Sequence, residues 1–368
     1  MPAELPPRER AGRLRLARLA HGLSQEQLAR VAGVTRQAVA GIETGRWDPS
    51  LRVALRLAGA LGVGVEALFG PPAAPPPEPV ELVGAPLPPG RRLRTAVVGE
   101  RRIGFPLTGV HGLAIGFEPA SAVVVEPGPD GRALAAPLLP GARTLVVAGC
   151  DPALALLRGP LERGDPSVEL LWWPCGTDQA LELLRLGLVH GAGVHGSEGE
   201  WDARAEVWRG AAPGGVDVVG FAGWREGWLW HPGLDGPVSA AAVAERRLPL
   251  VNREPGAEAR RVLDRECRRA GIDPASLAGY HAEVGGHLPV AAAVASGLGA
   301  VGIATEPAAL AFGLAFAALT TERSDLLIPR ALQGTLEVQA LYRVLGGPAL
   351  PRQLGAVAGY DASVCGQT

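Results

Sequence analysis

Hydrophobic side chains recur every three or four positions over residues 8–69, which is the spacing of amphipathic helices. Ser24 and the glutamine three positions later form a capping-box pattern, Gly33 ends the helix that follows, and Thr35 caps the next one. We therefore predict a compact all-α domain at residues 1–70. Its apolar positions are Leu14, Leu16, Leu19, Leu23, Leu28, Val31, Val34, Val39 and Ile42.

A proline-rich segment at residues 71–79 interrupts this pattern and predicts a stiff linker. Beyond it, residues 80–142 alternate short β-favouring runs with Gly and Pro turns, which is typical of a small β-rich module. The runs lie at residues 93–98, 113–117 and 122–125. The module also holds a basic group, which we interpret as a solvated face rather than a second nucleic-acid site. It consists of Arg91, Arg92, Arg94, Arg101 and Arg102.

Strand and helix patterns alternate over residues 143–368. Such alternation predicts parallel βαβ units in a doubly wound α/β sheet. In sheets of this kind, ligands bind beyond the carboxyl ends of the strands, next to helix N-termini. The predicted strands lie at residues 145–148, 168–173, 189–194, 216–221, 248–251 and 300–304, and the predicted helices at 152–161, 178–186, 238–245, 257–270, 288–296 and 334–345.

The composition is that of a folded protein with an uneven charge distribution. With 368 residues, 47% of them hydrophobic and 20% charged, the chain is too apolar for a disordered polymer and long enough to bury a sizeable core. Residues 1–70 carry ten Arg and six acidic residues, which gives this segment a net charge of +4. Because the whole chain has a net charge of −2, the remaining residues carry −6. A basic N-terminal domain on an acidic body favours a contact with nucleic acid.

Cysteine and histidine positions argue against metal and disulfide scaffolds. The four cysteines lie far apart and form no Cys-x-x-Cys pair. No signal-peptide pattern is visible, and the longest apolar stretch, residues 307–319, is too short to span a bilayer. We expect a soluble, cytoplasmic protein with no metal, no cofactor and no membrane contact. The histidines, too scattered to predict a metal site, are His190, His195, His231, His281 and His287.

The N-terminal domain presents a surface that is chemically suited to DNA. The helix that follows the turn leaves Thr35, Arg36, Gln37, Ala40 and Thr44 outside the apolar stripe. Arg can bind guanine through two hydrogen bonds, and Gln can bind adenine in the same way. We interpret the pair of helices as a helix-turn-helix; the alternative is a helical bundle that binds protein.

This pattern resembles the Cro/repressor (XRE) family of helix-turn-helix domains over residues 10–69. By that resemblance, Gln25 and Arg46 contact phosphates, while Arg36 and Gln37 reach base edges. Such domains usually bind palindromic half-sites as dimers. The resemblance therefore implies double-stranded operator DNA as a partner and a homodimer.

The junctions between strands and helices in the body carry the candidate ligand-binding residues. Several helix N-termini that meet at one cleft would offer many N–H donors to an anion. The candidates at or near these junctions are Cys150, Asp151, Gly176, Thr177, His195, Arg253, Gly256, Glu258 and His287.

Residues 143–368 resemble the type II periplasmic-binding-protein fold, and more closely the molybdate-binding-like domains that are fused behind a Cro-type head. The resemblance implies two lobes, one at about residues 143–220 and 315–368 and the other at about 221–314. It also implies molybdate or tungstate as the ligand. The segments that carry it are residues 147–154, 192–196, 250–253 with Gly256, 287–297 and 324–330.

One departure from the family pattern leaves the ligand open. Family members often carry a Gly-Ser-Gly-Thr-like turn after the Asn-Arg pair, whereas this chain has Gly256 followed by Ala-Glu-Ala. Hydroxyls are lost, and the Glu258 carboxylate disfavours an anion if it faces the cleft. An organic solute is therefore the second candidate ligand, and a ligand-free body that serves dimerisation is a third interpretation.

Each candidate also has a purely structural interpretation. Arg253 can pair with a carboxylate, His195 can be a hydrogen-bonded core residue, and Asp151 can cap its helix. Cys150 has no base at short spacing, so we interpret it as a small buried residue rather than a nucleophile. We therefore expect no enzyme but a one-component transcriptional regulator, in which closure of the lobes around a ligand changes DNA affinity.

Overall fold

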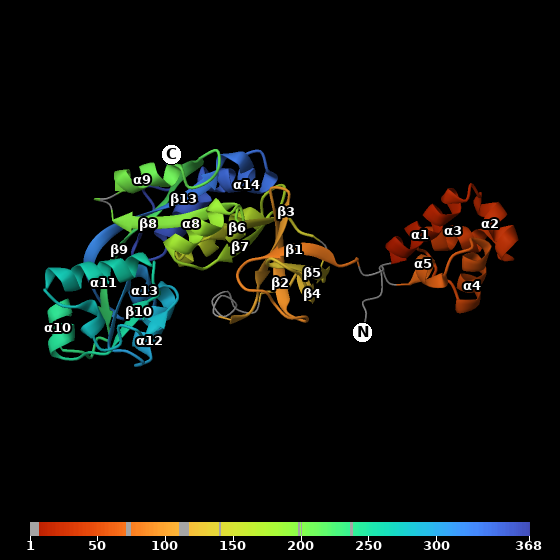
Figure 1. Cartoon of the computed structure of the whole chain (residues 1–368). Coiled ribbons are helices and arrows are strands. Elements are labelled where there is room, and N and C mark those ends of the chain that lie inside the picture. Colours follow the sequence, from red (N-terminus) through yellow and green to blue (C-terminus); the bar gives the residue numbers. More distant parts are fainter. Residues whose placement is uncertain are drawn as a thin grey trace. The chain divides into compact units, whose positions relative to one another are not determined.

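In the computed structural model the chain forms two compact units, Met1–Pro75 and Pro76–Thr368 (Figure 1). The structure describes residues 7–70, 75–109, 118–139, 141–197, 199, 201–235 and 238–368. The strand that we predict at residues 113–117 lies outside them. The first strand of the second unit starts at Glu78, inside the proline-rich segment that we predict to be a linker.

The first unit is a bundle of short helices. Ser24 caps α2 in the predicted capping box, and Gly33 ends that helix at a φ of 63°, a left-handed conformation that favours glycine. Leu16, Leu19 and Val31 belong to the apolar pattern but are more than half exposed. The helices are α1 (Pro7–Ala20), α2 (Gln25–Ala32), α3 (Arg36–Glu43), α4 (Leu51–Ala60) and α5 (Val65–Phe69). The buried core includes Leu14, Leu28, Val39, Leu57 and Leu61.

The second unit begins with a small closed barrel that packs against the body. Phe105 of the barrel contacts Trp173 edge-on, with ring centroids 5.4 Å apart. Arg94 is buried and pairs with Glu169 at 2.6 Å, so this part of the basic group is an internal contact rather than a solvated face. The strands β1 (Glu78–Leu82), β2 (Arg92–Val98), β3 (Arg101–Pro106), β4 (Ala122–Pro127) and β5 (Arg132–Pro137) follow the order β1-β3-β2-β4-β5.

The body is built on a mixed sheet rather than the parallel sheet that we predict. Its order is β11-β10-β12-β9-β13-β8-β6-β7, with β14 paired to β9. Pairing is parallel near both ends but antiparallel through β12, β9, β13 and β8. The strands are β6 (Thr144–Ala148), β7 (Glu169–Trp173), β8 (Gly191–Ser197), β9 (Val216–Trp230), β10 (Leu250–Arg253), β11 (Glu283–Val284), β12 (Val301–Thr305), β13 (Ala315–Pro329) and β14 (Tyr360–Asp361).

Two long strands join the halves of the body. The strands β9 and β13 each have 15 residues and pair along most of their length, so that they reach from the half with β6, β7 and β8 to the half with β10, β11 and β12 (Figure 1). The strand that we predict at 216–221 is therefore much longer, and the apolar stretch 307–319 contains the start of a strand that we did not predict.

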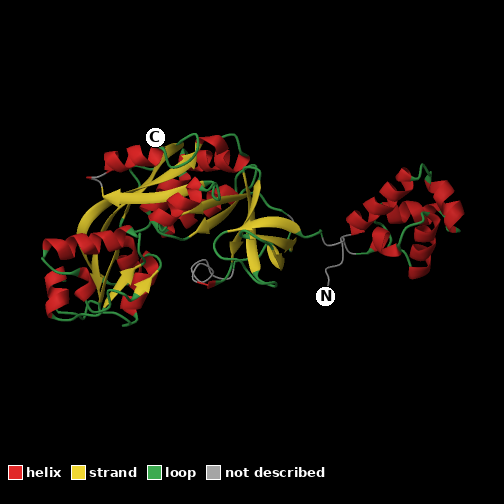
Figure 2. Ribbon diagram, viewed as in Figure 1, coloured by secondary structure: helices red, strands yellow, loops and turns green. Residues whose placement is uncertain are grey.

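Helices flank the strands in both halves (Figure 2). The helix that we predict at residues 152–161 is a 3₁₀ turn, Pro152–Leu157, followed by α7. No helix among the described residues has the length and apolar character needed to cross a membrane. The α-helices are α7 (Arg158–Glu162), α8 (Thr177–Arg185), α9 (Trp201–Arg209), α10 (Ala240–Glu245), α11 (Glu258–Arg269), α12 (His287–Ala295), α13 (Glu306–Ala311), α14 (Leu336–Leu345) and α15 (Ala349–Gly355).

Candidate DNA-binding face and ligand site

The start of α3 exposes the residues that we predict to read DNA. Arg36, Gln37 and Arg46 are exposed. Thr35 instead caps α3, because its Oγ1 accepts a hydrogen bond from the Ala38 N–H at 3.1 Å. The Thr44 hydroxyl likewise donates to backbone carbonyls within its own helix. Both threonines thus fix the ends of the helix that presents Arg36 and Gln37.

A buried ion pair holds the helix-turn-helix together. Arg18 of α1 donates to both carboxylate oxygens of Glu43 in α3, at 2.6 and 3.0 Å, and Gln25 of α2 donates to the same carboxylate at 2.8 Å. Burial raises the pKa of Glu43, but these hydrogen bonds outweigh it and hold the pKa below its usual value. Gln25, predicted to contact phosphate, is therefore also a structural residue. Neither Arg18 nor Glu43 carries a sequence signal that sets it apart.

A cavity of about 350 Å³ lies between the two halves of the body. Pro174, Cys175 and Gln179 line it from the first half, and residues 283–286 line it from the second. The lining residues are Cys150, Pro174, Cys175, Gln179, Arg253, Glu254, Glu283, Val284, Gly285 and Gly286. The cavity therefore lies where the carboxyl ends of β6, β7 and β10 meet, as the α/β pattern predicts for a ligand site.

Arg253 is the charged centre of this cavity. It ends β10 and is only 1% exposed. Its Nε and Nη2 donate to the Glu254 carboxylate at 2.7 and 2.8 Å, whereas its Nη1 has no hydrogen-bond partner among the described residues. Arg253 therefore pairs with a carboxylate, one of the two roles that we considered, and keeps one donor unused.

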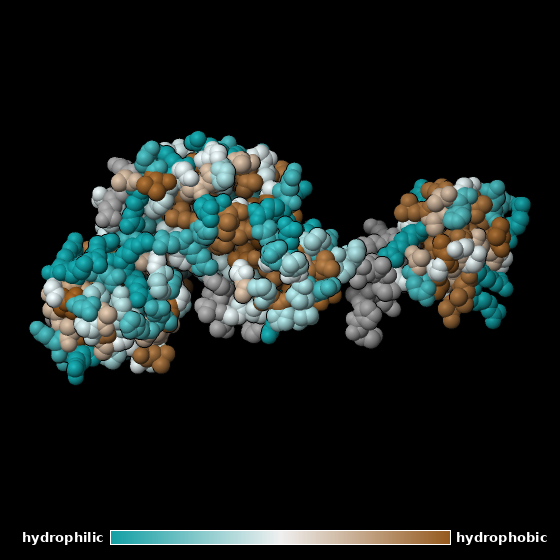
Figure 3. Space-filling view, viewed as in Figure 1, coloured by the Kyte–Doolittle hydropathy of each residue, from teal (hydrophilic) through white to brown (hydrophobic). Residues whose placement is uncertain are grey.

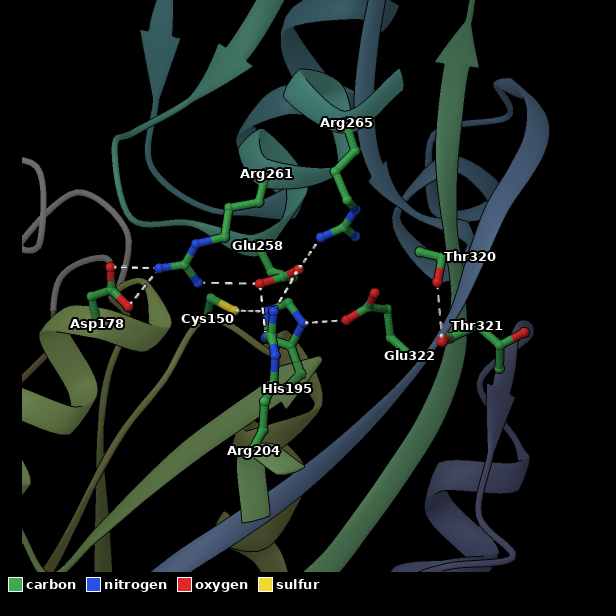
Figure 4. A network of polar contacts seen from close by, with 10 residues as sticks. All are labelled: Cys150, Asp178, His195, Arg204, Glu258, Arg261, Arg265, Thr320, Thr321 and Glu322. Carbon is green, nitrogen blue, oxygen red and sulfur yellow. Dashed lines mark hydrogen bonds and ion pairs between the residues drawn. The ribbon is translucent and has the colours of Figure 1, made fainter. Parts of the chain in front are cut away.

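A second group of polar side chains adjoins the cavity; we call it the Cys150 cluster (Cys150, His195, His287, Glu226 and Glu322). The Cys150 Sγ lies 3.0 Å from His195 Nε2 and 3.7 Å from His287 Nε2. The other ring nitrogen of His195, Nδ1, lies 3.2 Å from Glu322 Oε2 (Figure 4). Cys150 is buried, as we expect, and has no base at short sequence spacing, but the fold brings to its sulfur two histidines that are 45 and 137 residues away.

The surroundings shift the pKa values of the two histidines of this cluster in opposite directions. Burial lowers the pKa of His195, but Cys150 and Glu322 outweigh it, so that this pKa lies well above its ordinary value. Burial and the positive charges of Arg253 and His195 lower the pKa of His287 well below its ordinary value.

Two buried carboxyl groups complete the Cys150 cluster. Glu226 of β9 and Glu322 of β13 are both fully buried. Neither oxygen of Glu226 has a hydrogen-bond partner among the described residues. Glu322 has one partnered oxygen, Oε2, which contacts His195. Burial and the nearby Glu322 charge raise the pKa of Glu226 to about 8. Sequence reasoning missed both residues, since Glu226 lies beyond the predicted strand at 216–221 and Glu322 lies on β13, a strand that was not predicted.

Glu258 lies outside the cavity lining, in what we call the Glu258 cluster (Glu258 with Arg204, Arg261 and Arg265). Its buried carboxylate accepts from Arg204 at 3.0 Å, Arg265 at 3.1 Å and Arg261 at 3.2 Å (Figure 4). Burial raises its pKa, but the arginines outweigh this effect and hold the pKa at about 2. We expected this carboxylate to disfavour an anion if it faced the cleft, but it does not line the cavity and the arginines neutralise it. Around α11, which carries two of these arginines, the surface is hydrophilic (Figure 3).

The remaining candidates have structural roles close to the cavity. Asp151 caps the turn after β6 and accepts from Tyr360 Oη at 2.5 Å; burial raises its pKa to about 6. Gly176 precedes α8, and Thr177 is buried there with a hydroxyl that has no partner among the described residues. Gly256 has a φ of 87°, a left-handed conformation in which a side chain would also meet Asp178.

Comparison with known families agrees with this architecture. The family model described as the PBP superfamily domain matches residues 158–346, just over half of the chain. The chain belongs to this superfamily. A second family model, described as helix-turn-helix, matches residues 14–68. The protein is therefore a helix-turn-helix regulator whose body is a PBP domain.

Individual relatives match parts of the chain. An uncharacterized HTH-type transcriptional regulator of Methanocaldococcus jannaschii is 44% identical over 57 residues, which are 16% of this chain and 86% of that protein. An uncharacterized protein of Clostridium pasteurianum, encoded next to a ferredoxin gene, is 32% identical over 107 residues, or 29% of this chain and 95% of its own length. A putative phosphate transporter substrate-binding protein of Clostridium perfringens covers 60% of this chain and 99% of its own at 10% identity, with a TM-score of 0.45.

Proposed function

We propose that this protein is a cytoplasmic, homodimeric one-component regulator in which the helix-turn-helix domain binds operator DNA and the PBP domain binds a small ligand with an anionic group. The observation that carries the ligand assignment is Arg253, which lines the cavity, is fully buried and keeps Nη1 without a partner among the described residues. A buried donor that makes no hydrogen bond is costly, and an anionic group would supply that bond.

Two further buried groups with unused polar atoms support this proposal. Thr177 Oγ1 stands at the first turn of α8, between the lining residues Cys175 and Gln179. His287 directly follows the lining residue Gly286, and its Nδ1 has no hydrogen-bond partner among the described residues. A hydroxyl and an imidazole can each donate a hydrogen bond to an anion. Thr177 and His287 adjoin lining residues in the two halves of the body. In this proposal both donate to the anion, and its binding therefore favours closure of the halves.

Molybdate and tungstate are the first ligands to test, because the family resemblance implies them. The cavity itself favours a second candidate, an organic solute that carries an anionic group. Its volume of about 350 Å³ is in the usual range for sites of small organic ligands. Glu254, Glu283 and Val284 line it together with Arg253, which suits a larger ligand with mixed polarity.

Binding of the full chain to molybdate, tungstate, sulfate, phosphate and simple carboxylates tests the ligand assignment. Trp224 packs on His195 at 5.3 Å between ring centroids, so intrinsic fluorescence reports changes near the cavity. We expect saturable binding that weakens at least tenfold in Arg253→Gln but not in the control Arg246→Gln, which changes an exposed arginine of the second half. Equal ligand affinity of the two variants would show that Arg253 does not bind the ligand.

Selection of a DNA sequence from a random pool, followed by affinity measurements, tests the DNA face. The double variant Arg36→Ala with Gln37→Ala removes both predicted base contacts, each worth about 1–3 kcal/mol. We expect it to lose specific binding, while Arg52→Ala, an exposed arginine of α4, keeps it. Unchanged sequence preference in the double variant would show that another surface reads the DNA.

A further inference from the structure

Three side chains of the Cys150 cluster converge in the way that metal ligands do. One ligand atom from each of Cys150, His195 and His287 lies within 4.8 Å of the other two, and all three residues are buried. They come from three separate elements: the turn after β6, the strand β8 and the first residue of α12. Such convergence of a thiol and two imidazoles on one buried point is typical of a metal centre.

The distances fit a tetrahedral ion. Zinc lies about 2.3 Å from a thiolate sulfur and about 2.0–2.1 Å from an imidazole nitrogen, which in tetrahedral geometry places sulfur and nitrogen about 3.5 Å apart. The observed separations from Cys150 Sγ, 3.0 Å to His195 and 3.7 Å to His287, lie on either side of that value. Small side-chain rotations would therefore admit an ion without a backbone change.

The surroundings orient both imidazoles for coordination. His195 turns Nε2 to the thiol and Nδ1 to Glu322, and a metal-bound histidine typically places its second nitrogen on a carboxylate in this way. His287 turns its Nε2 to the same sulfur, at 3.7 Å. Glu322 is thus a positioning residue, and its second oxygen has no other partner among the described residues.

We propose that Cys150, His195 and His287 bind one divalent transition-metal ion of the zinc class. A set of one thiolate and two imidazoles selects such ions and disfavours magnesium and calcium, which prefer oxygen ligands. Three protein ligands leave the fourth tetrahedral position to an exogenous group, and Cys150 itself lines the cavity. The metal site does not depend on the anionic ligand proposed above, although the two share one wall of the cavity.

Titration of the untagged, chelator-treated full chain with Co²⁺ tests this site. Co²⁺ takes the geometry of zinc and gives a near-ultraviolet thiolate-to-metal absorption band, which reports the sulfur ligand directly. We expect one equivalent to bind, the band to vanish in Cys150→Ser, and Zn²⁺ to displace Co²⁺. Glu322→Gln should keep the band but weaken Co²⁺ binding about 10–100-fold.

Cys267→Ser is the matched control, since Cys267 is a fully buried thiol in a different hydrophobic cluster on α11. It should retain the full band. A band that persists in Cys150→Ser, or no binding to the wild-type chain, would overturn the proposal. If Cys150→Ser does not fold, alkylation of the wild-type chain tests the site instead, with the labelled cysteines located by mass spectrometry. We expect Zn²⁺ to protect the peptide that contains Cys150. Equal labelling of that peptide with and without Zn²⁺ would contradict the site.

The same preparations separate this site from the anion site. Arg253→Gln should lose the anion but still bind Co²⁺, because Arg253 contributes no metal ligand. Cys150→Ser should lose the Co²⁺ band in the absence of any oxyanion. If the wild-type chain binds Co²⁺ but no anion, only the proposed anionic ligand is rejected. If it binds an anion but gives no Co²⁺ band, only the proposed metal site is rejected.

Discussion

The Glu258 cluster and the Cys150 cluster are both buried in the PBP domain, yet they satisfy their polar atoms differently. The Glu258 carboxylate is bound by three arginines. Glu226 is equally buried, but both of its oxygens are without partners among the described residues. Native proteins satisfy most buried polar groups, and exceptions concentrate at functional sites. From this contrast we infer that the first cluster stabilises the fold, and we propose that the second binds a ligand.

Replacing the same residue type in both clusters should reveal this difference. Glu258→Met leaves three partly exposed arginines without their common acceptor, and loss of hydrogen bonds to a charged group typically costs about 1.5–3 kcal/mol. We expect a loss of that order in the free energy of unfolding, measured by chemical denaturation at pH 7. A loss below about 1 kcal/mol would mean that the Glu258 cluster contributes little to the fold.

Low pH should reduce the contribution of the Glu258 cluster to the free energy of unfolding. The pKa of Glu258 is about 2 in the folded protein, below the ordinary value of 4.5, so the unfolded chain binds more protons between these values. The stabilisation is complete above pH 4.5 and is lost as the pH falls toward 2. Thermal midpoints measured from pH 6 to pH 2.5 should therefore fall more steeply for the wild type than for Glu258→Met. Parallel curves would contradict this assignment.

Glu226→Met should have a smaller effect of the opposite sign. An apolar side chain of similar size removes two buried oxygens that make no hydrogen bond, and such exchanges are often neutral or stabilising by about 1–2 kcal/mol. Denaturation of the chelator-treated protein measures this. A destabilisation as large as that of Glu258→Met would erase the distinction between the two clusters.

An exposed ion pair on the same helix should matter least. Glu266 pairs with Arg269 one turn along α11, and the arginine is 72% exposed. Glu266→Gln should change the free energy of unfolding by less than about 1 kcal/mol, because solvent screens exposed pairs. A larger change would show that substitution anywhere on α11 disturbs the fold, and the Glu258→Met result would then lose its meaning.

Sequence predicts local features of this protein well. The capping box at Ser24, the turn at Gly33 and the exposure of Arg36 and Gln37 follow from residues within a few positions of each other. The strand that carries Arg253 is also predicted, although it ends at Arg253 rather than at residue 251. Each of these features depends on the conformation of one short segment, which the sequence of that segment largely determines.

Cys150, His195 and His287 are among the ligand-binding candidates that the sequence predicts, but their contacts with one another could not be predicted, because these depend on how distant segments pair. Cys150 and His287 are 137 residues apart, and no spacing rule connects them. Glu226 and Glu322 lie on β9 and β13, whose antiparallel pairing through the middle of the sheet contradicts the parallel order that alternation predicts. The predicted strand at 216–221 ends before Glu226, so the residue was not considered as part of the sheet.

The most direct test of the account is the effect of ligand on DNA affinity. The full chain should be measured on its selected DNA sequence with and without a saturating ligand from the titration panel. We predict a change of at least about fivefold in the wild type. We also predict no change in Arg253→Gln, whose affinity without ligand should equal that of the wild type. Equal DNA affinity of the ligand-free and ligand-saturated wild type would contradict the proposal that the PBP domain controls the helix-turn-helix.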